Sequence, residues 1–134
     1  MVIGLNPSTA DDINNDPTVR RCIGFARTWD HGGLIMTNIF SLRATDPRVM
    51  KKHPRPNGHE NDRWLSILAR ESGMVLAAWG NHGGHMDRDL EVMNILDGYA
   101  AGKVYCLDIT KKGFPKHPLY VRGDTRPILY AGRA

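Results

Sequence analysis

Four clusters of polar residues in this chain each follow a short apolar run. In chain order they are Asn6-Pro7-Ser8, Asn38, Gly80-Asn81-His82 and the segment 108–117, which ends on His117. Amides, hydroxyls and imidazoles donate and accept hydrogen bonds, and an imidazole also titrates near neutral pH. If the apolar runs are parallel strands, their carboxyl ends meet at one edge of a sheet, where open α/β proteins bind ligands. We therefore predict a polar ligand site at that edge.

Asn38 is the most informative of these residues, because Thr37-Asn38 interrupts an otherwise apolar run. A buried amide must find hydrogen-bond partners, either in the backbone or in a ligand. The other clusters have a structural alternative, since Asn, Gly, Pro and His are also ordinary turn residues. Their significance therefore depends on whether they meet in the fold.

The apolar runs have the length of strands and alternate with three segments of helical periodicity. The runs cover residues 1–5, 34–39, 74–79 and 103–107. The helical segments begin at Pro17, with Asp16 as N-cap, at about Glu60 and at about Met86. This alternation predicts a three-layer α/β/α fold around a mainly parallel, four-stranded central sheet.

Two further segments fit the pattern less regularly. The tail could add edge strands around Val121 and around residues 128–130. The segment 43–58 contains three prolines and is long for a connection, so we expect a surface or functional excursion there.

The length and composition of the chain limit the classes of protein to which it can belong. The 134 residues predict a single domain over 1–134. No apolar run approaches the roughly 18 residues that span a bilayer, and no secretory signal is visible, so we expect a cytoplasmic protein without a membrane partner. Cys22 and Cys106 are expected to be buried, reduced thiols, too few for a four-thiolate cluster. We expect no cofactor, and the oligomeric state is not indicated.

The formal net charge of +4 is compatible with a phosphate-bearing partner. A nucleotide hydrolase is not indicated, because the segment 80–84 lacks the Lys-Ser/Thr of a P-loop and the spacing of a dinucleotide-binding turn.

A metal-dependent hydrolase is one alternative that the histidines raise. His82 and His85, together with Asp108 or His117, could supply metal ligands. The His-x-x-His spacing lacks the acidic partner of a metalloprotease helix. We therefore expect no metal, and predict that His82 and His85 cap the helix that follows them.

Nearly the whole chain resembles a bacterial and phage family of unknown function. The resemblance is carried by the opening Leu-Asn-Pro-Ser-Thr-Ala-Asp, by Asp16-Pro17-Thr18-Val19-Arg20-Arg21-Cys22, and by the segments 38–47 and 78–80. This family brings no established activity, so the resemblance implies membership and nothing about chemistry.

The four strand-end blocks also resemble, in the same order, those of the uracil-DNA glycosylase superfamily. Gly4-Leu5-Asn6-Pro7 is similar to its first motif in the Asn-Pro form, and residues 34–38 are similar to the strand whose terminal Asn reads the base edge. Residues 75–80 are similar to the apolar strand that ends in Trp-Gly, and residues 117–122 to the second motif, His-Pro followed by a loop. The matched positions cover roughly a fifth of the chain. The resemblance implies a glycosylase-like fold.

The glycosylase resemblance implies a role for each block. Asn6, with the backbone after Pro7, would hold an attacking water, and Pro7 and Ser8 would contact the substrate. Asn38 would read the base edge, and His117 would donate a hydrogen bond to the base oxygen as the base leaves as an anion.

The remaining predicted contacts are also implied by this resemblance. Gly80 and His82 would line the substrate site, and Leu119 takes the position of the wedge, although the Ser and Pro that follow His-Pro in many glycosylases are absent. Arg122, with Lys116 and Arg126, would hold flanking phosphates. The aromatic that stacks on the base has no clear counterpart; Phe25, Trp29 and Phe40 are the candidates.

Together these implications predict a protein that binds a nucleobase in DNA or a nucleotide and hydrolyses the N-glycosidic bond of a damaged or unpaired base. Asn6 cannot accept a proton at neutral pH, so it cannot be the general base. Asp11, Asp12 and Asp16 are the carboxylates near it that could take that role. The alternative is a module that binds a nucleotide or nucleic acid without catalysis.

Overall fold

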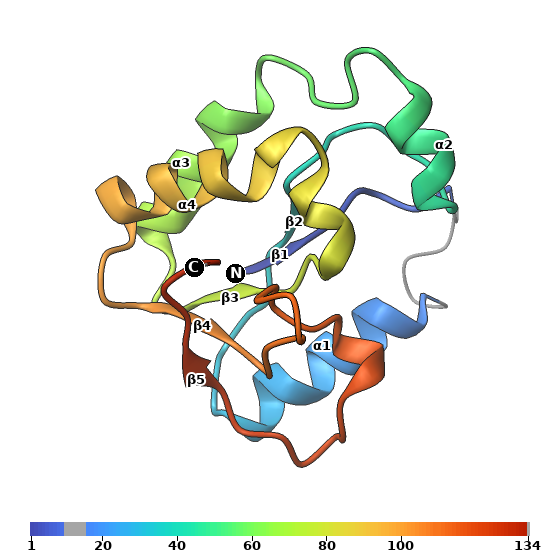
Figure 1. Cartoon of the computed structure of the whole chain (residues 1–134). Helices are drawn as coiled ribbons and strands as arrows, with labels where there is room; N and C mark the ends of the chain where they lie inside the picture. Colours follow the sequence, from blue (N-terminus) through green and yellow to red (C-terminus); the bar gives the residue numbers. More distant parts are fainter. Residues whose placement is uncertain (10–15, 134) are drawn as a thin grey trace.

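The computed structural model describes residues 1–9 and 16–133, which contain a five-stranded sheet (Figure 1). The strands are β1 (Val2–Gly4), β2 (Met36–Asn38), β3 (Val75–Ala77), β4 (Val104–Cys106) and β5 (Ile128–Leu129). Their order across the sheet is β2-β1-β3-β4-β5. The first four strands run parallel to one another, and β5 pairs antiparallel with β4. The mainly parallel sheet is confirmed, but it has five strands rather than four.

The fifth strand comes from the tail. Tyr105 pairs with Leu129 and Cys106 with Ile128, so the strand predicted around 128–130 is present. Val121 is not in a strand, because it directly follows a short 3-10 helix, η3 (Pro118–Tyr120). Because β5 has only two residues, its apolar pattern is too short to be distinguished from a loop by sequence alone.

Four α-helices lie in the described part of the chain: α1 (Pro17–Thr28), α2 (Pro47–Lys52), α3 (Asn61–Glu71) and α4 (Arg88–Tyr99). The predicted helices at Pro17 and near Glu60 are confirmed as α1 and α3. Asp16 caps α1 as expected, since its side chain accepts from the backbone N–H groups of Thr18 and Val19.

Two helical features differ from the expectation. The excursion 43–58 contains α2, which begins with the same Asp-Pro signal as α1 (Asp46 caps and Pro47 follows) and is anchored by the fully buried Met50. α4 begins two residues later than predicted, because Met86 and Asp87 have left-handed backbone angles that end the preceding 3-10 helix, η2 (Asn81–Asp87).

Helices cover both faces of the sheet (Figure 1). Because side chains alternate along a strand, Val2 and Leu76 point to the α1 face, where they pack with Cys22 and Phe25 of α1. On the opposite face, Ile3 and the other alternate residues pack with α3 and α4 side chains such as Leu65, Val92 and Leu96. Burial on both faces explains why the strands read as continuous apolar runs.

Within the described ranges, no helix has the length and apolar character needed to cross a membrane.

The strand-end loops are held mainly by backbone hydrogen bonds, which fix the polar clusters in place. Ile39 and Phe40 donate to the carbonyls of Gly4 and Leu5 at 2.9 Å, and Gly80 donates to Pro115 O at 2.8 Å. The exits of β1 and β2 are thereby joined to each other, and the exit of β3 to the segment that leads into His117.

Candidate functional site

Asn38 ends β2 directly beside the end of β1. Gly4 and Asn38 are paired in register, and a Cβ added to Gly4 would lie 2.9 Å from Asn38 Oδ1. The missing side chain at Gly4 therefore leaves the space that the Asn38 amide fills. Since Met36 packs against the α1 face and Asn38 lies two residues further along the strand, the amide also points to that face.

The backbone of Asn38 is fixed, whereas its amide is available. Asn61 Nδ2 of α3 donates to Asn38 O at 2.9 Å. Within residues 1–9 and 16–133, the side-chain amide of Asn38 makes no hydrogen bond, and the residue is half-buried. An amide held in this way offers one acceptor and two donors in a known orientation.

Asn6 serves a different purpose from Asn38. Its Nδ2 donates to Ala44 O at 2.8 Å and to Leu42 O at 3.0 Å, with a longer bond to Pro7 O at 3.3 Å. Ala44 N donates in return to Pro7 O at 2.9 Å. The amide nitrogen therefore ties the turn after β1 to the loop after β2, and only Oδ1 remains for the predicted contact with a water.

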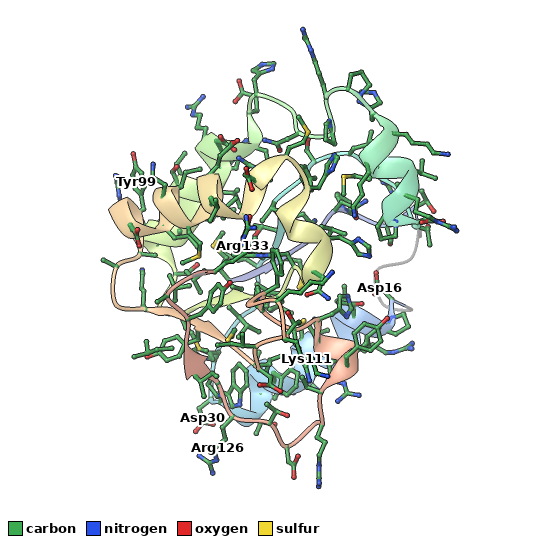
Figure 2. All side chains as sticks on the ribbon, in the orientation of Figure 1. Asp16, Asp30, Tyr99, Lys111, Arg126 and Arg133 are labelled. Carbon is green, nitrogen blue, oxygen red and sulfur yellow. The ribbon has the colours of Figure 1, made fainter. Side chains whose placement is uncertain are left out.

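Ser8 and Asp16 connect this turn to helix α1. Ser8 Oγ donates to Asp16 Oδ2 at 3.4 Å, while Asp16 Oδ1 accepts from the N–H groups of Thr18 at 2.8 Å and Val19 at 3.3 Å. Figure 2 shows Asp16 at the amino end of α1. Asp11 and Asp12, the other two candidate carboxylates, lie outside the described residues.

His117 is oriented by the backbone that follows it. Its Nδ1 accepts a hydrogen bond from Leu119 N at 3.2 Å, so this nitrogen carries no proton. Burial lowers the pKa of His117, and the nearby Asp16 carboxylate only partly opposes that effect. The ring is therefore neutral at pH 7, with its proton on Nε2, where it can be donated to a ligand.

Asn38, Asp16 and His117 occupy one side of one sheet edge. The Asn38 amide points to the α1 face, Asp16 caps α1, and η3, which begins directly after His117, packs against α1. The Asp16 charge also acts on the pKa of His117. Asn38, Asp16 and His117 therefore share one face of the sheet, and their convergence on one ligand stays a prediction.

The third block lies further toward α2. Gly80 has a φ of 71°, a value that favours glycine, and it makes the turn out of β3. His82 is an exposed residue. The pKa of its imidazole is lowered first by partial burial of the ring and then by the charges of Lys51 and Lys112, while the Asp46 carboxylate acts in the opposite direction. Gly80 is therefore a turn residue beside the site, and His82 faces the α2 side.

The predicted capping role of His82 and His85 is wrong. Neither η2 nor α4 has a side-chain cap, and the N-cap residue of α4 is Asp87, whose backbone is left-handed. His85 instead packs against Phe40, with ring centroids 5.8 Å apart. Among the described residues, no group of three His, Cys, Asp or Glu side chains is arranged to hold a metal, so the metal-hydrolase alternative has no ligand set there.

The predicted wedge and phosphate residues lie on the loop after His117. Leu119 is 40% exposed, and Arg122 is exposed and paired with Asp124, with Nη2 and Oδ2 3.2 Å apart. Arg21 of α1 donates to Val121 O at 3.1 Å, which fixes this loop against the helix. Of the predicted stacking aromatics, Phe25 and Phe40 are in the core and Trp29 stacks on Phe25.

A hollow of the surface lies away from these polar groups. It measures about 380 Å³ at the amino edge of the sheet, with Val2, Phe25, Leu34 and Leu76 among its mostly apolar lining residues. We assign the candidate site to the carboxyl edge nevertheless, because convergent polar groups, rather than hollow volume, give a ligand its orientation.

Sequence reasoning missed two residues that build the site. Asn61 pins the backbone of Asn38, and Arg43 Nε donates to Ser8 O at 3.3 Å. Both act through backbone carbonyls from distant segments, so no local pattern in the sequence indicates them.

A family model described as a protein of unknown function, DUF1643, matches residues 1–119. The chain belongs to this family, and its predicted membership of a family of unknown function is confirmed. No curated protein and no solved structure matches the chain. The glycosylase resemblance stays a prediction, and any function has to be argued from the site.

Replacing Asn6 by Asp tests whether its amide is structural. The substitution turns two donors into acceptors that face the carbonyls of Leu42 and Ala44, so we expect a loss of about 1–3 kcal/mol in the free energy of unfolding. Urea denaturation measures this loss. Asn94→Asp, on the exposed surface of α4, adds the same charge and should change stability by about 0.5 kcal/mol or less. Equal stability of Asn6→Asp and wild type would contradict the structural role.

The lowered pKa of His117 predicts a pH dependence of stability. The unfolded chain takes up the proton at the ordinary pKa of about 6.5, before the folded chain does, so the folded state loses stability as pH falls below that value. His117→Asn keeps an acceptor for Leu119 N and removes the titrating group. Urea denaturation from pH 7.5 to pH 5 should show a smaller loss for His117→Asn than for wild type. Parallel losses in the two proteins would contradict the assignment.

Proposed function

We propose that the protein binds a nucleobase at the carboxyl edge of the sheet, in a fold of the uracil-DNA glycosylase type. The observation that carries the proposal is the Asn38 amide, which is fixed at its backbone and unpaired at its side chain within the described residues. An amide presents a donor and an acceptor side by side, which matches the hydrogen-bonding edge of a pyrimidine base.

His117 supplies a second observation in support of the same proposal. Its Nδ1 is occupied by Leu119 N, and burial keeps the ring neutral, so Nε2–H is a donor. A neutral donor can bind a base oxygen and strengthens as that oxygen gains negative charge. Helices on both faces of a mainly parallel sheet support the glycosylase-type fold.

Binding is tested with free uracil and 2′-deoxyuridine by isothermal titration calorimetry. We expect Asn38→Ala to weaken binding by roughly 5- to 150-fold, the range of about 1–3 kcal/mol for a lost bidentate contact. Asn94→Ala, which removes an exposed amide from α4, should leave the affinity unchanged. Equal affinities of wild type and Asn38→Ala would sink the proposed base contact.

A specific observation favours hydrolysis of the N-glycosidic bond as a second function. The Asp16 carboxylate is close enough to His117 to act on its pKa, and it is held by Ser8 and by the start of α1. Asp16 would accept a proton from water as that water attacks the sugar carbon, while the base leaves with the bonding electrons and His117 stabilises its oxygen. Asn6 Oδ1 would help to orient the water. Without this step the site is a binding module.

Asp16→Asn separates a chemical role of Asp16 from its structural one. Asparagine is as good an N-cap as aspartate, so stability should change by less than about 0.5 kcal/mol, whereas a general base is lost. Base release from oligonucleotides containing uracil, hypoxanthine or a mismatch should fall at least about 100-fold. Release that survives Asp16→Asn would contradict this role, and wild-type binding without any release would reduce the function to binding.

A further inference from the structure

An open groove of about 460 Å³ lies between α1 and the loop that contains Leu119 and Gly123. Arg20, Arg21 and Gly24 of α1 line one wall, and Leu119 and Gly123 line the other. The groove begins beside the candidate site, because α1 starts directly after Asp16 and the opposite wall starts two residues after His117.

The charge of the groove is positive. Arg20 is exposed and has no ion-pair partner in the described ranges, and Arg21 uses Nη1 to hold Val121 O at 3.1 Å. The residues that line the groove include no Asp or Glu. The groove therefore presents uncompensated arginine charge that suits a phosphate backbone.

The rest of the groove is apolar or lacks side chains. Pro17, Phe25 and Leu119 contribute apolar surface, and a Cβ at Gly24 would contact nothing within 4 Å, which leaves open space at the helix surface. Tyr120, 80% exposed, stands beside Leu119 with its ring centroid 5.6 Å from that of His117. Cations along a groove, with an exposed aromatic next in sequence to one of its lining residues, are elements with which proteins bind single strands.

We propose that this α1 groove binds single-stranded DNA next to the base site. A hollow of this volume belongs to the size class of small-ligand sites, so it accepts one or two nucleotides of a single strand and excludes a duplex. Deoxyribose is favoured over ribose, because Pro17, Phe25 and Leu119 in the lining offer no hydrogen-bond partner to an additional hydroxyl. The inference rests on the proposed function, which sets the orientation of the bound strand: the nucleotide that follows the groove carries its base toward Asn38 and His117.

The experiment measures fluorescence anisotropy of a labelled thymidine oligonucleotide of about 10 nucleotides, within the range of single-strand site sizes. Arg20→Gln removes one phosphate contact, so we expect about five-fold weaker binding at 0.1 M salt and a salt slope smaller by about 0.7. Arg27→Gln is the matched control, because Arg27 is an exposed arginine of the same helix that does not line the groove. The duplex and the corresponding RNA should bind more weakly than the DNA strand.

Equal effects of Arg20→Gln and Arg27→Gln, or no effect of either, would overturn the groove assignment. Equal or tighter binding of duplex or RNA would overturn its preference for single-stranded DNA. Free 2′-deoxyuridine, which has no phosphate, tests the base site separately. If deoxyuridine binds but Arg20→Gln leaves the affinity for the oligonucleotide unchanged, the groove inference alone fails. If the oligonucleotide depends on Arg20 but deoxyuridine does not bind, the base site alone fails.

Discussion

Strand β1 pairs in parallel with β2 on one side and with β3 on the other, and this pairing determines where the polar residues of the chain meet. The register Gly4–Asn38 brings the ends of β1 and β2 level. Because Gly4 has no side chain, the Asn38 amide lies over the end of β1. A one-residue slip would turn Asn38 to the α3 and α4 face and remove it from the side that carries Asp16 and His117.

The two asparagines at this edge illustrate how one side-chain type serves two purposes. The side-chain amide of Asn6 donates hydrogen bonds to the carbonyls of Leu42 and Ala44, so it stabilises the turn that follows β1. An aspartate would present oxygen to oxygen there, which gives a structural reason for asparagine at this position. Asn38 is pinned through its backbone by Asn61, and its side-chain amide makes no hydrogen bond within the described residues. In the proposed hydrolysis, the general base would therefore be Asp16 rather than a residue of the opening turn.

Much of the fold could be predicted because its signals are local. The apolar runs, the Asp16-Pro17 helix start and the alternation of strands and helices are all readable within short windows. The two-residue strand β5 and the short helix α2 were harder, because each carries too little periodicity to stand out; the Asp46-Pro47 signal of α2 was present. The left-handed pair Met86-Asp87, which delays α4, has no indication in residue type.

The candidate site was predictable in outline but not in detail. Parallel strand ends implied that Asn6, Asn38 and His117 meet at one edge, whereas the partners of each side chain depend on distant backbone carbonyls. The tautomer of His117 follows from one hydrogen bond with Leu119 N, which only the folded loop reveals. His82 and His85 read as helix caps in the sequence, but the break before α4 turns them to other surroundings.

The proposed function requires that a nucleobase contacts Asn38 and His117. Titration of ¹⁵N-labelled protein with uracil, followed by ¹H–¹⁵N correlation spectra, tests it most directly. We predict that two sets of signals shift and reach a plateau as uracil is added. These are the signals of the Asn38 side-chain amide and of the Leu119 backbone amide, which donates a hydrogen bond to His117. Shifts confined to Leu34, Trp29 and their neighbours at the apolar amino edge, with Asn38 and Leu119 unchanged, would contradict it.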